Sequence, residues 1–213
     1  LLTNSDYTSS EVIEWLDIPE SKVCTISAAT EEHFDISEIS ANNFSELKEK
    51  YGITRDVVLY APGGFDSRKN FKRLIEAYSK LTPELREKNQ LVIVSKLSDS
   101  DRSYLHSIAR NQQLRDDEMV LTGYVSEQDL VVFYQLAKLF VFASLHEGFG
   151  LPILEAMTCG AATIGSNVTS IPEVIGYADA LFDPYSVESI RDKLQQALSD
   201  DVFLAQLKKH ALE

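Results

Sequence analysis

Short apolar runs alternate with amphipathic stretches along most of the chain. Uninterrupted apolar runs of a few residues predict strands that are buried on both faces of a sheet. The main runs are 57–61, 91–95, 119–122 and 139–143, and shorter predicted strands are 22–27, 161–165 and 180–182. Between them, apolar residues recur at helical spacing, as at Phe71, Leu74, Ile75 and Tyr78.

Polar residues and proline mark the ends of the predicted helices. Thr8 and Glu11 have the spacing of a capping box and predict a helix that continues to Leu16. Asn70 and Ser126 predict side-chain caps. Another predicted helix has Phe44, Leu47 and Tyr51 on one side. Further helices are predicted over 99–111 and from Pro152 to Cys159, and the end of the chain is predicted to be helical with a break near Asp200.

This alternation predicts an α/β fold, a doubly wound, Rossmann-like parallel sheet with helices on both faces. Ligands of such sheets bind beyond the carboxyl ends of the strands. The chemistry is therefore expected in the loops that follow Ala61, Ser95, Thr122 and Ala143.

The charge of the chain narrows the choice of partners. Its 33 acidic and 20 basic residues give a formal charge of −13. Nucleic acids and anionic membranes both need clustered Lys and Arg, so neither is expected to bind here. No apolar run of about 18 residues predicts a membrane span, and the first residues lack the pattern of a signal peptide. Asp99 and Asp101 are interpreted as helix-start caps, and no metal site is expected.

The loop after Ala143 brings glycines to the start of a helix. Gly148 and Gly150 flank Phe149, and Leu151, at the expected cap position, has no side-chain oxygen for the first amides of the helix. Unpaired amides that are reached through glycines favour the binding of a phosphate group.

Two carboxylates bracket this phosphate site, Glu147 in the loop and Glu155 one turn inside the helix. A carboxylate repels a phosphate, so both are expected to bind neutral hydroxyls, and sugars attached to the phosphate would supply them. The alternative interpretation is a tight turn with two solvated glutamates, because a lone glycine pair is a weak motif.

The loop after the strand at 57–61 presents a glycine turn and two cations. Gly63 and Gly64 form the turn, and Arg68 and Lys69 stand at the start of the next helix. A cation at a helix N-terminus is electrostatically unfavourable, which favours a functional role such as binding a departing diphosphate. The spacing is not that of a Walker loop. An exposed basic pair is the alternative.

The segment EGFGLPILE, in which Glu147 and Glu155 are separated by seven residues, resembles the E-x7-E signature of glycosyltransferase family 4. The following CGAATIGSNVTSIPEVIG continues the pattern, and the resemblance runs from Ser5 to the end of the chain. It implies the donor half of a GT-B fold. Residues 1–34 would then be the last part of the acceptor-side domain with the crossover, and 35–213 the nucleotide-sugar-binding domain.

The resemblance also implies roles for single residues. Glu147 would contact hydroxyls of the donor sugar, and Glu155 those of the ribose. The backbone of 148–151, with Phe149, Gly150 and Leu151, would face the sugar and the phosphates.

Further roles implied by the resemblance lie outside the glycine loop. Lys69 matches a family lysine that contacts the diphosphate. Many members have an arginine where this chain has 63–64, and Arg68 is a candidate substitute. Tyr124 and Val125 match an element that lies against the nucleotide base.

In the family the sugar is transferred with retention at the anomeric carbon, and the donor half neutralises the leaving diphosphate and orients the sugar. The resemblance therefore implies a retaining hexosyltransferase that uses no cofactor or metal. GGFDSRKN is similar to mannosyltransferases of bacterial polysaccharide assembly, which favours GDP-mannose over UDP- or ADP-linked donors.

The same resemblance places the acceptor domain and the closing helix outside these residues. The acceptor, a glycan or a lipid-linked sugar, would bind there, as would any membrane, and this chain alone is expected to be inactive. The expected location is the cytoplasm, with attachment to the inner face of the membrane left open.

Other interpretations stay open. The chain could be a degenerate nucleotide-binding module, although the glutamate pair and Lys69 count against it, or an epimerase of the same architecture. A nicotinamide-dependent enzyme is disfavoured because GxGxxG is missing after the first long strand. Lys96 is either solvated or near the base, and His146 is interpreted as a positioning or packing residue.

Overall fold

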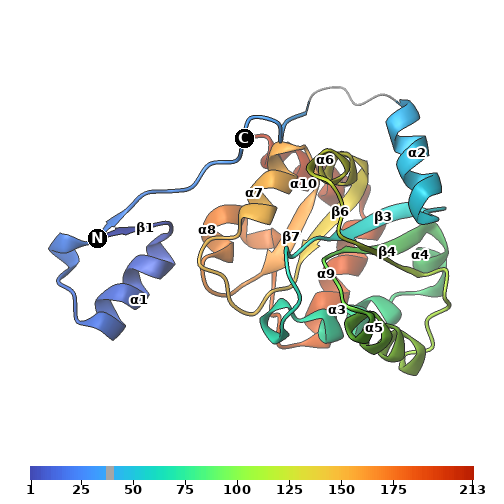
Figure 1. The fold of residues 1–213 in the computed structure, drawn as a ribbon, viewed down its shortest axis with the longest axis horizontal. Helices are drawn as coiled ribbons and strands as arrows, with labels where there is room; N and C mark the ends of the chain where they lie inside the picture. The colour runs from blue at the N-terminus through green and yellow to red at the C-terminus, as the bar shows by residue number, and fades with distance from the viewer. Residues whose placement is uncertain (37–40) are drawn as a thin grey trace.

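A computed structural model describes residues 1–36 and 41–213 (Figure 1). Within them a six-stranded sheet has the order β5-β4-β3-β6-β7-β8, and all neighbouring strands are parallel. The strands are β3 (Asp56–Tyr60), β4 (Asn89–Val94), β5 (Met119–Gly123), β6 (Ala137–Phe142), β7 (Thr163–Ser166) and β8 (Leu181–Phe182). The order reverses between β3 and β6, which makes their carboxyl ends the switch point of the sheet.

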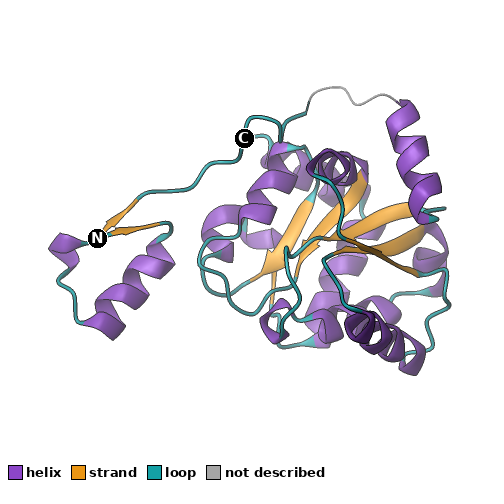
Figure 2. Cartoon of the chain, viewed as in Figure 1, coloured by secondary structure: helices purple, strands orange, loops and turns teal. Residues whose placement is uncertain are grey.

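Helices cover both faces of this sheet (Figure 2). One layer contains α3 (Phe71–Ser79), α5 (Asp99–Asn111) and α9 (Val187–Ser199), with the short α4 (Pro83–Lys88) beside α9. The other contains α2 (Ala41–Tyr51), α6 (Glu127–Leu136), α7 (Leu151–Thr158) and α8 (Ile171–Ile175), and α10 (Asp201–Ala211) packs against α7 and α9. The predicted doubly wound fold is confirmed.

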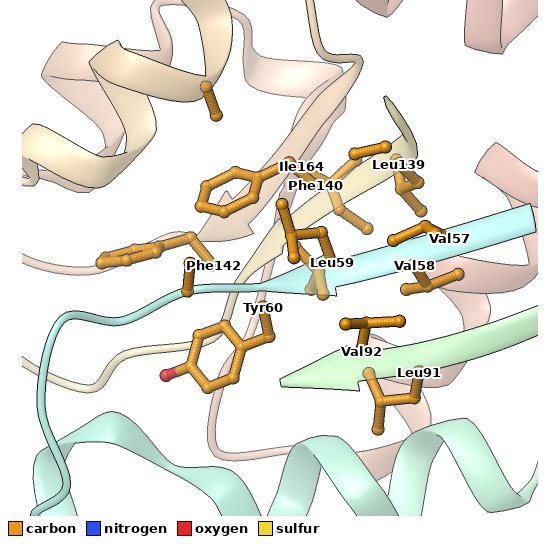
Figure 3. Close-up of a cluster of buried hydrophobic side chains, with 14 of the residues drawn as sticks. Val57, Val58, Leu59, Tyr60, Leu91, Val92, Leu139, Phe140, Phe142 and Ile164 are labelled. Carbon is orange, nitrogen blue, oxygen red and sulfur yellow. The ribbon is translucent and has the colours of Figure 1, made fainter. Parts of the chain in front are cut away.

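The core lies on both sides of the strands, because a parallel sheet covered by two helix layers has no solvated face. Figure 3 shows Tyr60 of β3 and Phe140 and Phe142 of β6 among these side chains. Tyr78, which is fully buried, still satisfies its hydroxyl by donating to Asn89 O at 2.8 Å.

The N-terminal residues form a small unit of their own (dark blue in Figure 1). The strand β1 (Leu2–Thr3) pairs in parallel with β2 (Cys24–Thr25), and α1 (Asp6–Leu16) connects them. This two-stranded sheet is separate from the main one. The start of α1 contacts the glycine loop that follows β6.

Three helix starts differ from the sequence-based expectation. The capping box at Thr8 was wrong, because Ser5 is the N-cap and its hydroxyl accepts from Thr8 N at 3.0 Å. Asn70 has φ of 56° and no side-chain cap bond; its amide instead holds neighbouring loops. The N-cap of α7 is Gly150, at φ 111°, one residue before the expected Leu151.

The predicted cap at Ser126 is confirmed, since its side chain accepts from Asp129 N at the start of α6. At the start of α5 the N-cap is Ser98 and not the expected Asp99, while Asp101 takes part in the cap by forming a capping box with Ser98. Helices α4 and α8 and strand β1 were not predicted, because at two to six residues they are too short to show a period.

Candidate functional site

The loops after β3 and β6 leave adjacent strands at the switch point and lie side by side. Leu145 N donates to Arg68 O at 2.7 Å, and Asn70 Nδ2 donates to Ala143 O at 3.0 Å and to Pro184 O at 2.9 Å. Asn70 is buried. These bonds fix the loop after β3, which carries Arg68 and Lys69, against the glycine loop after β6. Two of the four predicted loops therefore belong to one site.

Lys69 and Glu147 meet across this junction. Lys69 Nζ lies 2.7 Å from Glu147 Oε1, and the two side chains are 12% and 15% exposed. The hydroxyl of the buried Tyr60 donates to Lys69 O, which fixes the backbone beneath the lysine. The structure therefore pairs the residue that was predicted to bind the diphosphate with the residue that was predicted to contact the sugar.

The glycine loop is held by its carbonyl groups. Ser170 Oγ lies 2.9 Å from Glu147 O and 2.8 Å from Phe149 O, and Gly148 O accepts from hydroxyls of the N-terminal unit. Within the described residues, none of the amides of 148–151 donates a hydrogen bond. These free donors lie at the start of α7, where the helix dipole adds positive potential.

A cavity of about 400 Å³ adjoins the start of α7. It is bounded by residues at the carboxyl ends of β3, β4 and β5 and by residues of α6 and α7. Its lining residues are Ala61, Gly63, Val94, Ser95, Lys96, Gly123, Tyr124, Val125, Leu130, Tyr134, Leu151, Pro152 and Glu155. The volume is within the range of small-molecule sites.

The predicted site residues thus fall into two adjoining groups. Gly63, Tyr124, Val125, Leu151 and Glu155 line the cavity, as does Lys96. The glycine segment with Gly148, Phe149 and Gly150 comes directly before Leu151 in the chain. Glu147 precedes this segment and holds Lys69 as its ion-pair partner. Gly64 is not among the lining residues.

Glu155 is half-buried on the cavity wall. Tyr134 donates its hydroxyl to Glu155 Oε2 at 2.9 Å. Burial raises the pKa of Glu155 above its usual value, against the hydrogen bond from Tyr134, which acts to lower it. The carboxyl therefore takes up a proton at higher pH than an exposed glutamate does.

Arg68 has a different partner from Lys69. Its Nε and Nη2 lie 3.2 Å from Asp66 Oδ1 and Oδ2, and its side chain is 57% exposed. Burial acts to raise the pKa of Asp66, but the hydrogen bonds from Arg68 hold it below the usual value. The structure does not bring the Arg68 side chain to the cavity.

Three residues of the site were missed by sequence reasoning. Ser95, which lines the cavity, is 4% exposed and its Oγ has no hydrogen-bond partner within the described residues. Ser170 binds the loop carbonyls, and Tyr134 binds Glu155. Ser95 could have been singled out, because it ends an apolar strand at the carboxyl edge of the sheet.

Other predicted features have plain structural roles. His146 makes an edge-to-face contact with Tyr7, their ring centroids 5.8 Å apart.

Across 1–36 and 41–213, no group of three or more His, Cys, Asp or Glu side chains is placed to hold a metal ion. In the same residues no helix combines the length and the apolar character needed to cross a bilayer.

Two relatives by sequence carry mannosyltransferase names. Over 208 residues the chain is 43% identical to the serotype-specific mannosyltransferase WbdA of Escherichia coli, a match that covers 98% of this chain and 25% of the relative. It is 35% identical over 201 residues to the O-antigen chain mannosyltransferase B of the same species, covering 94% and 52%. The chain thus spans between a quarter and about half the length of these relatives.

Solved structures share the fold at lower identity. The glycosyltransferase WaaG, involved in lipopolysaccharide biosynthesis, superimposes with a TM-score of 0.83 at 20% identity, over 100% of this chain and 57% of that one. Anabaena HepE in complex with UDP and glucose gives 0.84 at 18% identity, over 99% and 56%. The model of the family "Glycosyl transferases group 1" matches residues 43–213, and this chain belongs to that family.

Proposed function

We propose that this chain is the donor-binding part of a retaining hexosyltransferase, with residues 1–34 from the acceptor side and 35–213 holding the nucleotide sugar. One observation carries the proposal. At the switch point of the sheet, a cavity with a half-buried carboxylate adjoins the start of α7, where the amides of 148–151 have no partner within the described residues and where Glu147 pairs with a lysine that is 12% exposed.

The division of the site suggests how a nucleotide sugar would lie. The nucleoside takes the cavity, with Glu155 accepting from the ribose hydroxyls and the base between Tyr124 and the backbone of Val125. The diphosphate lies along the free amides of 148–151 and beside Lys69. The sugar then comes next to Glu147.

The chemistry follows from this placement. The bond from the anomeric carbon to the diphosphate breaks while the acceptor hydroxyl forms its new bond on the same face. Lys69 and the amides at the start of α7 stabilise the negative charge that gathers on the diphosphate, which is electrostatic preorganisation. Arg68 lies two residues from Asp66 and would have to leave that carboxylate to contribute.

The proposed donor is GDP-mannose, and the proposed product is a cell-surface polysaccharide. The mannosyltransferase names of the relatives at 43% and 35% identity support this donor. The acceptor, a glycan or lipid-linked sugar, and any attachment to the inner face of the membrane would involve residues outside this chain. A cytoplasmic site of action is part of the proposal, since nucleotide sugars are its substrates.

A thermal-shift panel with GDP-mannose, UDP-glucose, ADP-glucose and NADH tests the proposal on the full-length protein. Stabilisation by GDP-mannose alone is the expected result, followed by transfer of mannose with the α-configuration retained in the product. No stabilisation by any nucleotide would support a degenerate module. An epimerised donor without transfer would support an epimerase.

A further inference from the structure

The carbonyl of Gly148 is held by a segment that lies about 140 residues earlier in the chain. Ser5 Oγ is 2.6 Å and Thr8 Oγ1 is 2.9 Å from Gly148 O. Ser5 is 1% exposed, so its hydroxyl is shielded from water, whereas the bond from Thr8 lies at the surface. The bond from Ser5 is therefore stronger than a surface hydrogen bond, because little water competes for it.

The start of α1 is fixed on a second side as well. The two oxygens of Glu173, in α8, accept from Asp6 N at 2.9 Å and Tyr7 N at 2.7 Å. A carboxylate at the first amides of a helix is favourable, since it satisfies free donors and complements the helix dipole. The ring of Tyr7 also packs against His146. The start of α1 is therefore bound both to the loop that contains His146 and Gly148 and to α8.

These contacts act on one peptide group. In a trans peptide the carbonyl and the amide of the next residue point in opposite directions, and none of the described bonds is cis. Hydroxyls that hold Gly148 O therefore fix the direction of the Phe149 N–H, which has no partner within the described residues.

The flanking peptides are held differently. The carbonyls of Glu147 and Phe149 both lie within hydrogen-bond distance of the single hydroxyl of Ser170, which belongs to the main sheet domain. Only the middle carbonyl of these three is bound by the start of α1. The direction of the Phe149 amide is thus set by side chains of the N-terminal unit. The directions of the Gly148 and Gly150 amides are set by Ser170 of the main domain.

We infer that Ser5 and Thr8 are positioning residues for donor binding: they aim the Phe149 amide at the diphosphate, and donor affinity depends on α1 staying docked. This inference rests on the proposed function. The N-terminal unit, on the acceptor side, then contributes to binding of the diphosphate leaving group. Movement of that unit therefore changes the affinity for the donor.

Calorimetry with the full-length protein tests the inference. GDP is titrated beside guanosine, which has the same base and ribose but no phosphates. Thr8→Val keeps the shape of the side chain and the backbone bond to Ser5 but removes the hydroxyl. It should weaken GDP binding about threefold to tenfold and leave guanosine binding unchanged. Thr8→Ser should restore the affinity for GDP.

Ser10→Ala is the matched control, because among the described residues its exposed hydroxyl bonds only to Tyr7 O, within α1. It should bind GDP like the wild type. Equal GDP affinity of Thr8→Val and wild type overturns the inference and leaves the proposed function standing. Equal loss of GDP and guanosine binding also overturns it, since that marks general damage. A wild type that binds no GDP, UDP or ADP overturns the proposed function and this inference together.

Discussion

Lys69 Nζ lies 2.7 Å from Glu147 Oε1, across the junction of the two loops at the switch point. Both side chains are largely shielded, so solvent screens the pair less than a surface ion pair. A diphosphate that binds beside Lys69 would replace the carboxylate as the partner of the ammonium group. The carboxylate of Glu147 would then be free to accept hydrogen bonds from the sugar. Under the proposed function, the ion pair would keep both groups in place until the donor binds.

Lys69→Met should lower the affinity for GDP at least about tenfold, because a charged hydrogen bond to phosphate is lost and an unpaired carboxylate is left beside it. Calorimetry on the full-length protein measures the change. Lys72→Met is the matched control, since Lys72 is 64% exposed and, within 1–36 and 41–213, its ion-pair partner is Glu76 on its own helix. Unchanged affinity in Lys69→Met would remove Lys69 from the phosphate site.

Glu147→Gln should have opposite effects on GDP and on the donor sugar. Loss of the carboxylate frees Lys69 for the diphosphate, so GDP binds more tightly, while the contact with the sugar is weakened and transfer falls. The melting temperature should drop, because the shielded lysine loses its charged partner at a cost on the order of 1–3 kcal/mol. Calorimetry with GDP and with GDP-mannose separates the two effects. Weaker GDP binding in this variant would show that the carboxylate does not compete for Lys69.

The fold and most of the site could be predicted because each rests on local signals. Buried parallel strands appear in the sequence as uninterrupted apolar runs, and the glycines and acidic residues after β6 mark the start of α7. The pairing of Lys69 with Glu147 could not be predicted from either loop alone. It depends on β3 and β6 being neighbours, which only the strand order decides.

The errors also have physical reasons. Asn70 has the residue type of a cap, but its position beside β6 gives its amide two buried carbonyls to satisfy, and this need outweighs the cap. Thr8 has capping-box spacing, but Ser5 takes the cap and leaves the Thr8 hydroxyl for Gly148. Contacts between distant segments decided the case of Asn70, and sequence spacing does not report them. In the case of Thr8 the cap was decided locally by Ser5, and only the bond of the Thr8 hydroxyl to Gly148 joins distant segments.

Guanosine binding should weaken as the pH falls through the pKa of Glu155. Burial raises that pKa, so the carboxyl is protonated at a higher pH than an ordinary glutamate and loses an acceptor for the ribose hydroxyls. Guanosine is used because it has no phosphate to titrate. By the same shift, the free energy of unfolding should rise as the pH falls from the raised pKa toward the usual glutamate value.

Calorimetry between about pH 7 and about pH 4.5 checks this, with Glu155→Gln as the comparison. The amide in that variant cannot titrate, so its affinity for guanosine should be weaker than that of the wild type at neutral pH and independent of pH. A wild-type affinity that stays constant over the range would show that the Glu155 carboxylate does not hold the ribose.

Ser95→Ala should leave the free protein as stable as the wild type or slightly more stable, while weakening guanosine binding. Ser95 Oγ is buried without a partner among the described residues, and a buried hydroxyl in that state costs about 1–3 kcal/mol that alanine does not incur. Because Ser95 lines the cavity, a bound base can supply the missing partner. Ser166→Ala is the contrasting variant, since Ser166 is also buried but its hydroxyl donates to Phe142 O at 3.2 Å, and its loss should lower the melting temperature. If Ser95→Ala is destabilised as much as Ser166→Ala, the Ser95 hydroxyl already has a partner in the free protein and has no hydrogen bond left to offer the nucleoside.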